Sequence, residues 1–317
     1  MRICKEVLEN IFLVSAHKLA SVLTQETWEN WLRLLLGITD SIFRNKGSAS
    51  PNAHAYLIKS LAPSAVRVLL EIWLLSKTMN FYLWKSLLEL IPNWVIVPTV
   101  WHWNSLCYAL TTRTMALMYG AQYGPENVPL EWQIDEKTTL KSYINLPAQY
   151  TYYAWQRFLH ALPNPNTYTD PEVFRVAFSG IAKLVDVYLN AADAMKRDPS
   201  IKQRAKSPPC GNTIMAIFGR WLVEAVLADR VGFEDGTSQA VGALCRIFCR
   251  APEPADGFLQ VHLASFYAAL SKVLQKEIHD KVLSTAILNC RTLFLRELQG
   301  SHCLIPYFFY AFSRVWV

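Results

Sequence analysis

The residues that could carry acid–base, nucleophilic or metal chemistry do not form a recognisable motif in this chain. The seven histidines are scattered, and no two have metal-ligand spacing with a cysteine or carboxylate on the same helical face. His302 and Cys303 are adjacent, so they point in different directions on a helix. Phosphate-binding, nucleophile-elbow and zinc-protease motifs do not occur, and Gly120-x-x-x-Gly124 lacks the following Lys-Ser/Thr. We therefore expect no catalytic residue, no metal site and no cofactor.

The seven cysteines also lack a pattern that indicates disulfides or zinc. No CxxC pair occurs. Cys245 and Cys249 lie one helical turn apart beside Leu244, Ile247 and Phe248. Buried free cysteines act as small hydrophobic side chains, which favours core packing over redox chemistry for this pair. Cysteine usage of this kind is typical of the reducing cytosol, and we expect a cytoplasmic protein.

Arg113, Arg220 and Arg246 each lie in an apolar stretch of sequence and could be imagined as arginine fingers. Such a finger must be presented to a nucleotide from an exposed position. Arginines in apolar surroundings more often pair with carboxylates or helix carbonyls, and we assign no catalytic role to these three.

Two tryptophans are the candidate partner contacts. Trp101 and Trp103 are two residues apart, so on a helix they cannot both face one core stripe. At least one of them must lie at an interface or between neighbouring helices. Tryptophan is enriched at binding hot spots, although packing within the chain remains the favoured alternative.

A basic linker is expected at Lys196–Gly211, a stretch of low hydrophobicity. Within it, Arg204-x-x-Ser207-Pro208 presents a serine after basic residues. Ser207 is therefore a candidate phosphorylation site, where phosphate would reduce the local positive charge. The linker divides the chain into a first helical array (1–195), the linker (196–211) and a second part of the array (212–317).

Helical periodicity dominates the elements that must position these residues. Thr24 is expected to cap a helix carrying Trp28, Trp31, Leu32, Leu35, Ile38 and Ile42 at three- and four-residue steps. Asp170, as N-cap before Pro171, starts another helix. Further helices are expected at 53–77, 81–90, 100–119, 147–162, 212–229, 237–250, 257–276, 280–298 and 304–317. Pro63 is expected to kink or split the helix at 53–77. Glycines and prolines between Gly120 and Asn145 indicate a surface loop.

The expected fold is therefore all-α. Short connections make successive helices pack antiparallel, which predicts an α-solenoid of stacked helical hairpins. The hairpins share no recurrent motif, so the array would be a degenerate relative of HEAT and armadillo repeats. The chain opens and closes inside expected helices, which indicates a piece of a longer product.

Charge and hydropathy bear on whether the chain binds nucleic acid or a membrane. The net charge of +6 comes from scattered lysines and arginines, which disfavours nucleic-acid binding. No charged residue occurs between Glu89 and Arg113, an interval long enough to cross a bilayer. Pro92, Pro98 and several polar side chains interrupt it, so two helices joined by a proline turn explain it better. A membrane-associated helical protein with a hydrophobic segment near 90–112 remains the alternative.

Eight blocks of sequence, in order, resemble a known family. They are QETWENWLRLLLGITDSI (25–42), VLLEIWLLSKT (68–78), NWVIVPTVWHWNSLCYALTTR with MYG (93–120), WQRFLHALPNP (155–165), FSGIAKLVDVYL (178–189), IFGRWLVEAV (217–226), GALCRIFCR (242–250) and LIPYFFYAF (304–312). Together they resemble the N-terminal helical region of the beta subunits of Ral GTPase-activating protein complexes, which are relatives of the tuberin complex. The resemblance covers nearly the whole chain.

The resemblance implies a non-catalytic scaffold. In that family the alpha subunit carries the GTPase-activating domain, whose asparagine acts on Ral-type small GTPases bound to GTP. The beta subunit stabilises the heterodimer and lacks that asparagine, so no catalytic residue can be carried onto this chain. The expected partner is therefore the alpha subunit, and Ral-type GTPases would be indirect partners. The family has a long insertion where Lys196–Gly211 is short, so regulation there is in doubt.

Overall fold

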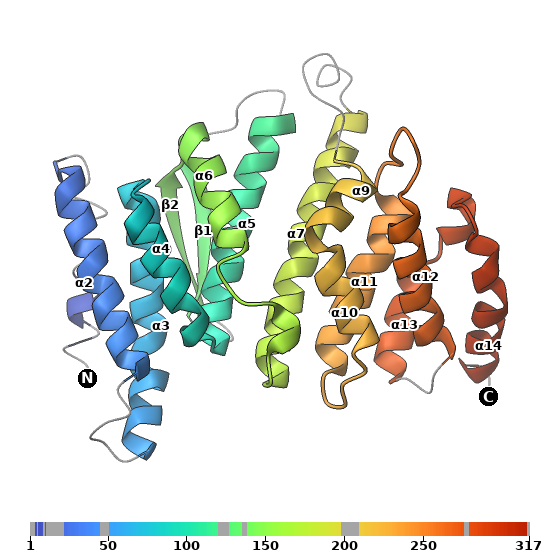
Figure 1. The fold of residues 1–317 in the computed structure, drawn as a ribbon, viewed down its shortest axis with the longest axis horizontal. Coiled ribbons are helices and arrows are strands. Elements are labelled where there is room, and N and C mark those ends of the chain that lie inside the picture. The colour runs from blue at the N-terminus through green and yellow to red at the C-terminus, as the bar shows by residue number, and fades with distance from the viewer. Residues whose placement is uncertain are drawn as a thin grey trace. The chain divides into compact units, whose positions relative to one another are not determined.

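The computed structural model describes residues 4, 6–8, 10, 22–44, 51–119, 127–134, 138–197, 209–275 and 279–315. Helices dominate these residues, and one β-hairpin interrupts them (Figure 1). The predicted helical class is confirmed. The chain divides into two compact units, which comprise residues 1–114 with 124–163 (unit 1) and 115–123 with 164–317 (unit 2).

Unit 1 begins with three helices and a 3₁₀ turn and ends with a hairpin and a further helix. Its elements are α2 (Gln25–Arg44), α3 (Pro51–Ser76), α4 (Phe81–Leu90), η2 (Ile91–Trp94), α5 (Val97–Tyr119, in this unit up to Thr114), β1 (Asn127–Gln133), β2 (Thr139–Asn145) and α6 (Ala148–Leu159). Helix α2 packs against α3 and α4, and β2 packs against α3.

Fully buried tryptophans fill the core of unit 1, namely Trp73, Trp84, Trp94, Trp103 and Trp132. A buried indole needs a partner for its N–H group. Trp84 donates to the carbonyl of Thr78 over 2.9 Å, and Trp94 donates to Oδ1 of Asp40 over 3.3 Å. These hydrogen bonds fix how α4 and η2 sit within the unit.

The hairpin corrects the prediction of a surface loop at 120–145. Strands β1 and β2 pair antiparallel, from Asn127 opposite Asn145 to Gln133 opposite Thr139. Val128, Leu130 and Trp132 are buried, while the residues between them are exposed. This alternation is the sequence signature of a half-buried strand. It outweighs Pro129, because proline is tolerated on an edge strand.

Helix α3 passes through Pro63 without being split. Proline removes one backbone N–H donor from the helix. The carbonyl of Pro63 itself lies 3.0 Å from Nε2 of His102, so α5 supplies a hydrogen bond to α3 at this point. The expected split of this segment is therefore wrong.

Unit 2 is helical throughout the part that the structure describes. Its elements are η3 (Pro165–Thr167), α7 (Pro171–Arg197), α9 (Gly211–Ile214), the π-helical turn η4 (Met215–Gly219), α10 (Arg220–Leu227), α11 (Glu234–Arg250), α12 (Gln260–Gln275), α13 (Asp280–Asn289), η5 (Leu293–Arg296), η6 (Ser301–Leu304) and α14 (Ile305–Val315). The predicted cap of α7 is confirmed, because Oδ1 of Asp170 accepts from the backbone N–H of Glu172 over 2.8 Å.

The helices of unit 2 form two layers, drawn from yellow to red in Figure 1. Helix α11 packs against both α7 and α13, and α12 packs against both α10 and α14. Contacts of α10 with α11 and of α12 with α13 join the layers. Arg246 of α11 reinforces one layer, since its guanidinium binds Asp186 of α7 at 2.8 Å and lies 3.5 Å from Asn289 of α13.

Two boundaries differ from the predicted ones. Helix α13 ends at Asn289 and not at Leu298, because the backbone of Cys290 leaves the helical conformation, with φ −98° and ψ 5°. The division between the two units lies at Pro163 and Asn164, and helices on either side of 196–211 belong to unit 2. Residues 198–208 lie outside the described residues, so the linker stays a prediction.

Candidate partner-binding groove

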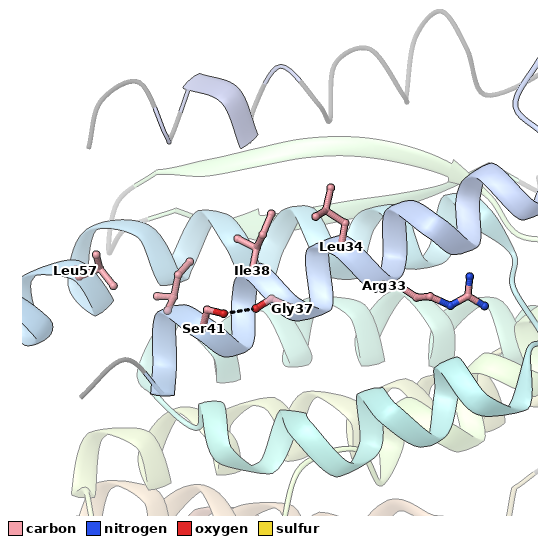
Figure 2. A pocket seen from close by; sticks show the side chains of 7 residues that line it. Arg33, Leu34, Gly37, Ile38, Ser41 and Leu57 are labelled. Atoms are coloured by element: carbon pink, nitrogen blue, oxygen red, sulfur yellow. Dashed lines mark hydrogen bonds between the residues drawn. The ribbon is translucent and has the colours of Figure 1, made fainter. Parts of the chain in front are cut away.

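A groove of about 530 Å³ runs along the surface of α2 (Figure 2). Six of the residues that line it come from α2 and one comes from α3. They are Arg33, Leu34, Gly37, Ile38, Ser41, Ile42 and Leu57. We call this feature the α2 groove.

The apolar stripe of α2 is wider than the unit needs for its own core. Trp28, Leu32 and Leu35 are buried against the rest of unit 1. Leu34, by contrast, is 58% exposed, and Ile38 is half-buried. Both side chains line the groove, so α2 is apolar on its outer side as well. Contiguous exposed apolar side chains of this kind are typical of interaction sites.

Gly37 leaves open space in the α2 groove because it has no side chain. A Cβ placed on Gly37 would meet nothing within 4 Å. One turn later, Oγ of Ser41 donates to the carbonyl of Gly37 over 2.7 Å, as Figure 2 shows. Small residues on a helix surface let a partner helix approach closely. This stretch therefore suits a helical or extended apolar segment of another chain.

Among the residues that the structure describes, Arg33 is the one ionisable residue in the lining of the groove. Its guanidinium donates to Oδ1 of Asn30 over 2.8 Å and lies 3.5 Å from Oε2 of Glu29. Glu29 also accepts from Nδ2 of Asn80 at 2.8 Å, which ties this end of α2 to the start of α4. The described lining of the groove therefore holds one paired cation and the hydroxyl of Ser41, without a second ionisable group beside either, and this composition suits the binding of a partner.

A buried polar cluster holds the hairpin against α3. Arg67 and Glu71 form an ion pair at 3.4 Å, with their side chains 5% and 1% exposed. Burial raises the pKa of Glu71, and hydrogen bonds with Ser142 and Trp132 and the charge of Arg67 partly oppose that rise. The indole N–H of Trp132 also donates to Oγ of Ser142 over 3.1 Å. These contacts join α3 to both strands.

His102 lies beside this cluster and is nearly fully buried. Burial lowers the pKa of His102 to about 3, and the nearby charge of Arg67 lowers it further, although the hydrogen bond with Pro63 opposes the shift. The imidazole is therefore neutral near pH 7. Arg67, Glu71 and His102 are buried, and their contacts position the hairpin against the helices.

The two predicted partner contacts have different surroundings. Trp103 is 2% exposed, and its indole N–H donates to the carbonyl of Phe158 over 2.6 Å, so it belongs to the core of unit 1. Trp101 is half-buried. A partner contact of Trp101 stays a prediction, and the burial of Trp103 favours the alternative of packing within the chain.

The three arginines considered as fingers all have partners within the chain. Nε of Arg113 donates to the carbonyl of Leu146 over 3.4 Å, and Arg246 pairs with Asp186. Arg220 is largely exposed and pairs with Glu224 at 2.8 Å. Arg113 and Arg246 are therefore held within the fold, whereas most of the Arg220 side chain lies in solvent.

Three further points concern the candidate phosphorylation site, metal binding and the alternative of a membrane span. Ser207 lies outside the described residues. Among those that are described, no group of histidine, cysteine and carboxylate side chains is arranged to hold a metal ion. Within the same ranges, no helix has the length and apolar character needed to cross a membrane, and this includes α5 in the uncharged interval.

Comparison with known proteins assigns the part of the chain that contains the α2 groove. A family model described as the RALGAPB N-terminal domain matches residues 1–121. This part of the chain is similar to the RALGAPB N-terminal domain. The predicted resemblance to the beta subunits of Ral GTPase-activating proteins is thereby confirmed. The matched residues include α2, α3, α4 and α5.

Relatives of the chain extend the similarity beyond the RALGAPB N-terminal domain. A Rap-GAP domain-containing protein of Dictyostelium discoideum is 31% identical over 99% of this chain, which spans 18% of that relative. The Ral GTPase-activating protein subunit beta of Homo sapiens is 23% identical over 99% of this chain and 30% of its own length. The rat subunit beta is 30% identical over 69% of this chain and 14% of its own length. The chain thus spans less than a third of each relative. No solved structure matches.

The sequence predicts the helix that carries the α2 groove, but it does not predict that this helix has an exposed apolar groove. Ile38 and Ile42 were assigned to one core stripe with Trp28 and Leu32, whereas Ile38 lies at the edge of that stripe. The signal that could have revealed it is Leu34 together with Gly37. A leucine on the polar side of an amphipathic helix, three residues before a glycine, indicates an outer apolar strip.

Proposed function

We propose that this chain is the scaffold part of a heterodimeric GTPase-activating protein complex that acts on Ral-type small GTPases. It would bind and stabilise the catalytic alpha subunit, and the α2 groove would be one of its contact surfaces. The observation that carries the proposal is the position of an exposed apolar groove inside the RALGAPB N-terminal domain. The complex would be cytoplasmic.

The residues of the α2 groove support binding rather than catalysis. Leu34, Ile38 and Leu57 provide apolar contact area, and Gly37 leaves room for a partner backbone. Arg33 at one end would give orientation through its planar guanidinium. Covering these apolar side chains with a partner would stabilise the complex by roughly 25 cal/mol for each Å² of apolar surface removed from water.

The arrangement of unit 2 supports a solenoid as the architecture of the scaffold. Each layer adds one helix next to the preceding one, α7–α11–α13 on one side and α10–α12–α14 on the other. Stacked helix pairs that contact mainly their neighbours are the defining property of α-solenoids. We propose that unit 2 is a degenerate array of this type.

The test is co-purification of the alpha subunit with variants of the chain. Leu34→Glu places a charge in the α2 groove, and Gly37→Leu fills it. Neither change touches the core, because Leu34 is exposed and the space above Gly37 is open. We expect the affinity of both variants for the alpha subunit to fall at least tenfold. This corresponds to a loss of about 1.4 kcal/mol of binding free energy.

Leu288→Glu is the matched control, because Leu288 is 71% exposed but lies in α13, outside residues 1–121. It should bind the alpha subunit like the unmodified chain. Equal recovery of the alpha subunit with all three variants would rule out the α2 groove as the contact. Failure of the unmodified, folded chain to bind would overturn the proposed function itself.

A further inference from the structure

Three of the seven cysteines meet inside unit 2. Cys245 and Cys249 lie on successive turns of α11, and Cys290 caps the C-terminal end of α13. The residues on either side of Cys290 contact this part of α11: Oγ1 of Thr292 lies 3.5 Å from the carbonyl of Cys249, and Asn289 lies 3.5 Å from the guanidinium of Arg246. The side chain of Cys290 therefore lies beside those of Cys245 and Cys249, and each influences the other's pKa. All three are free thiols. The packing of α11 against α13 brings them together, although Cys290 is distant from the other two in sequence.

The three thiols differ in how far solvent reaches them. Cys245 is fully buried, whereas Cys249 is 6% exposed and Cys290 is 4% exposed. A small oxidant would therefore meet Cys249 or Cys290 before Cys245. Cys107 is also buried, but it lies alone in unit 1 against the carbonyl of Phe158.

Two polar side chains partly offset the factors that raise the pKa of Cys249, namely Thr292 through a hydrogen bond and Arg296 through its charge. Oγ1 of Thr292 lies 3.5 Å from the carbonyl of Cys249, and the guanidinium of Arg296 donates to the carbonyl of Ala251 over 2.6 Å. The Nε atom of Arg296 is buried and has no hydrogen-bond partner. A positive charge next to a thiol promotes its ionisation and hence its reaction with oxidants.

We propose that Cys249 and Cys290 form a redox modification site, at which a peroxide or another two-electron oxidant converts the two thiols into a disulfide. With hydrogen peroxide, the thiolate of Cys249 attacks one peroxide oxygen and becomes a sulfenic acid, releasing hydroxide that takes up a proton as water. The thiol of Cys290 then attacks that sulfur, the S–S bond forms, and the S–O bond breaks to release a second water. Two thiols lose two electrons, and one peroxide is reduced to two waters.

Such a disulfide would join α11 to α13 covalently. Hydrogen bonding with Cys290 and burial raise the pKa of Cys249, and the hydrogen bond with Cys245 raises the pKa of Cys290. Both thiols are therefore mostly protonated at neutral pH, and the reaction is slow compared with that of a dedicated peroxidase. The site responds to sustained oxidation.

The experiment exposes the folded chain to hydrogen peroxide, blocks the remaining thiols with N-ethylmaleimide and maps peptides without reduction. We expect a Cys249–Cys290 linked peptide in the unmodified chain and in Cys245→Ala. We expect none in Cys249→Ala or Cys290→Ala. In Arg296→Gln the link should form more slowly, while alkylation of exposed Cys303 by N-ethylmaleimide stays unchanged. Far-ultraviolet circular dichroism checks that each variant is folded.

The map of the unmodified chain decides the proposal even if a variant does not fold. Separate sulfinic or sulfonic products on Cys249 and Cys290, without a linked peptide, would overturn it. So would a link between Cys245 and Cys290 in place of the proposed one. A linked peptide that appears equally in urea-unfolded chain would also count against a site made by the fold.

Discussion

The burial of the His102 side chain makes the stability of unit 1 depend on pH. Its imidazole is enclosed by α3 and the hairpin, and Nε2 meets the carbonyl of Pro63. Its Nδ1 atom is buried and has no hydrogen-bond partner. The folded state therefore holds a neutral ring and resists its protonation.

The unfolded chain protonates His102 near its ordinary pKa of 6.5, whereas burial lowers the folded-state pKa to about 3. As the pH falls below 6.5, the unfolded state takes up a proton that the folded state does not. The free energy of unfolding should therefore fall by up to about 1.4 kcal/mol for each pH unit between these values.

His102→Gln removes this titration but retains a donor for Pro63. Urea denaturation between pH 7 and 4 should show a shallower loss of stability for this variant than for the unmodified chain. His302→Gln, at an exposed position, should follow the unmodified chain. Parallel pH profiles for His102→Gln and the unmodified chain would contradict the assignment.

Single residues could be predicted where the cause of their conformation is local. Asp170 caps α7 because its carboxylate reaches the N–H groups two and three residues later, a relation contained in a few positions of sequence. Leu34 and Gly37 could not be assigned in the same way. Whether an apolar residue on α2 faces the core or the solvent depends on which elements cover it, and α3 and α4 do not cover this side.

At the scale of elements, the hairpin is the part that sequence reasoning missed. Long helices such as α7 and α11 repeat their apolar positions over several turns, so periodicity locates them within a few residues. Strand β1 has only three buried apolar positions, and glycine and proline residues lie before and within it. These residues are typical of loops, so the alternation of apolar and polar positions was not recognised as a strand. Helix α13 begins at Asp280 as predicted, but its C-terminal end is not apparent from the sequence, because it depends on the backbone conformation of Cys290.

Adjacent residues of β1 test whether the hairpin is part of the core. Leu130 is fully buried, whereas the side chain of Glu131 is 58% exposed and pairs with Lys141. Leu130→Ala should lower the free energy of unfolding by about 2–5 kcal/mol, because it leaves a cavity between the hairpin and the helices.

Glu131→Ala is the control for this change, since exposed ion pairs contribute about 0–1 kcal/mol. Chemical denaturation followed by tryptophan fluorescence measures both variants. Equal stabilities for the two would mean that residues 127–133 behave as a surface loop.

At the scale of the whole molecule, the chain is built from contacts between helices, and the described surface offers a groove rather than a reaction centre. The part of the α2 groove lining that the structure describes contains one ionisable side chain, Arg33, which is paired with Glu29. Under the proposed function, this chain contributes binding surface and the alpha subunit contributes the chemistry.

The chain alone should therefore leave GTP hydrolysis by a Ral-type GTPase at its intrinsic rate. Single-turnover hydrolysis of radiolabelled GTP measures this directly. Together with the alpha subunit, the chain should raise the amount of active complex recovered. Acceleration by the purified chain without the alpha subunit would show that it carries a catalytic group.

The hairpin has a consequence for how other chains can attach. A two-stranded sheet has outer edges at which a foreign strand could continue the ladder. Pro129 removes one amide donor from β1, and Glu131 and Lys141 place opposite charges on the exposed face of the hairpin. These features discourage edge-to-edge pairing and aggregation. Binding of a partner by addition of a strand to the hairpin is therefore disfavoured, and we expect a partner chain to bind to the helices.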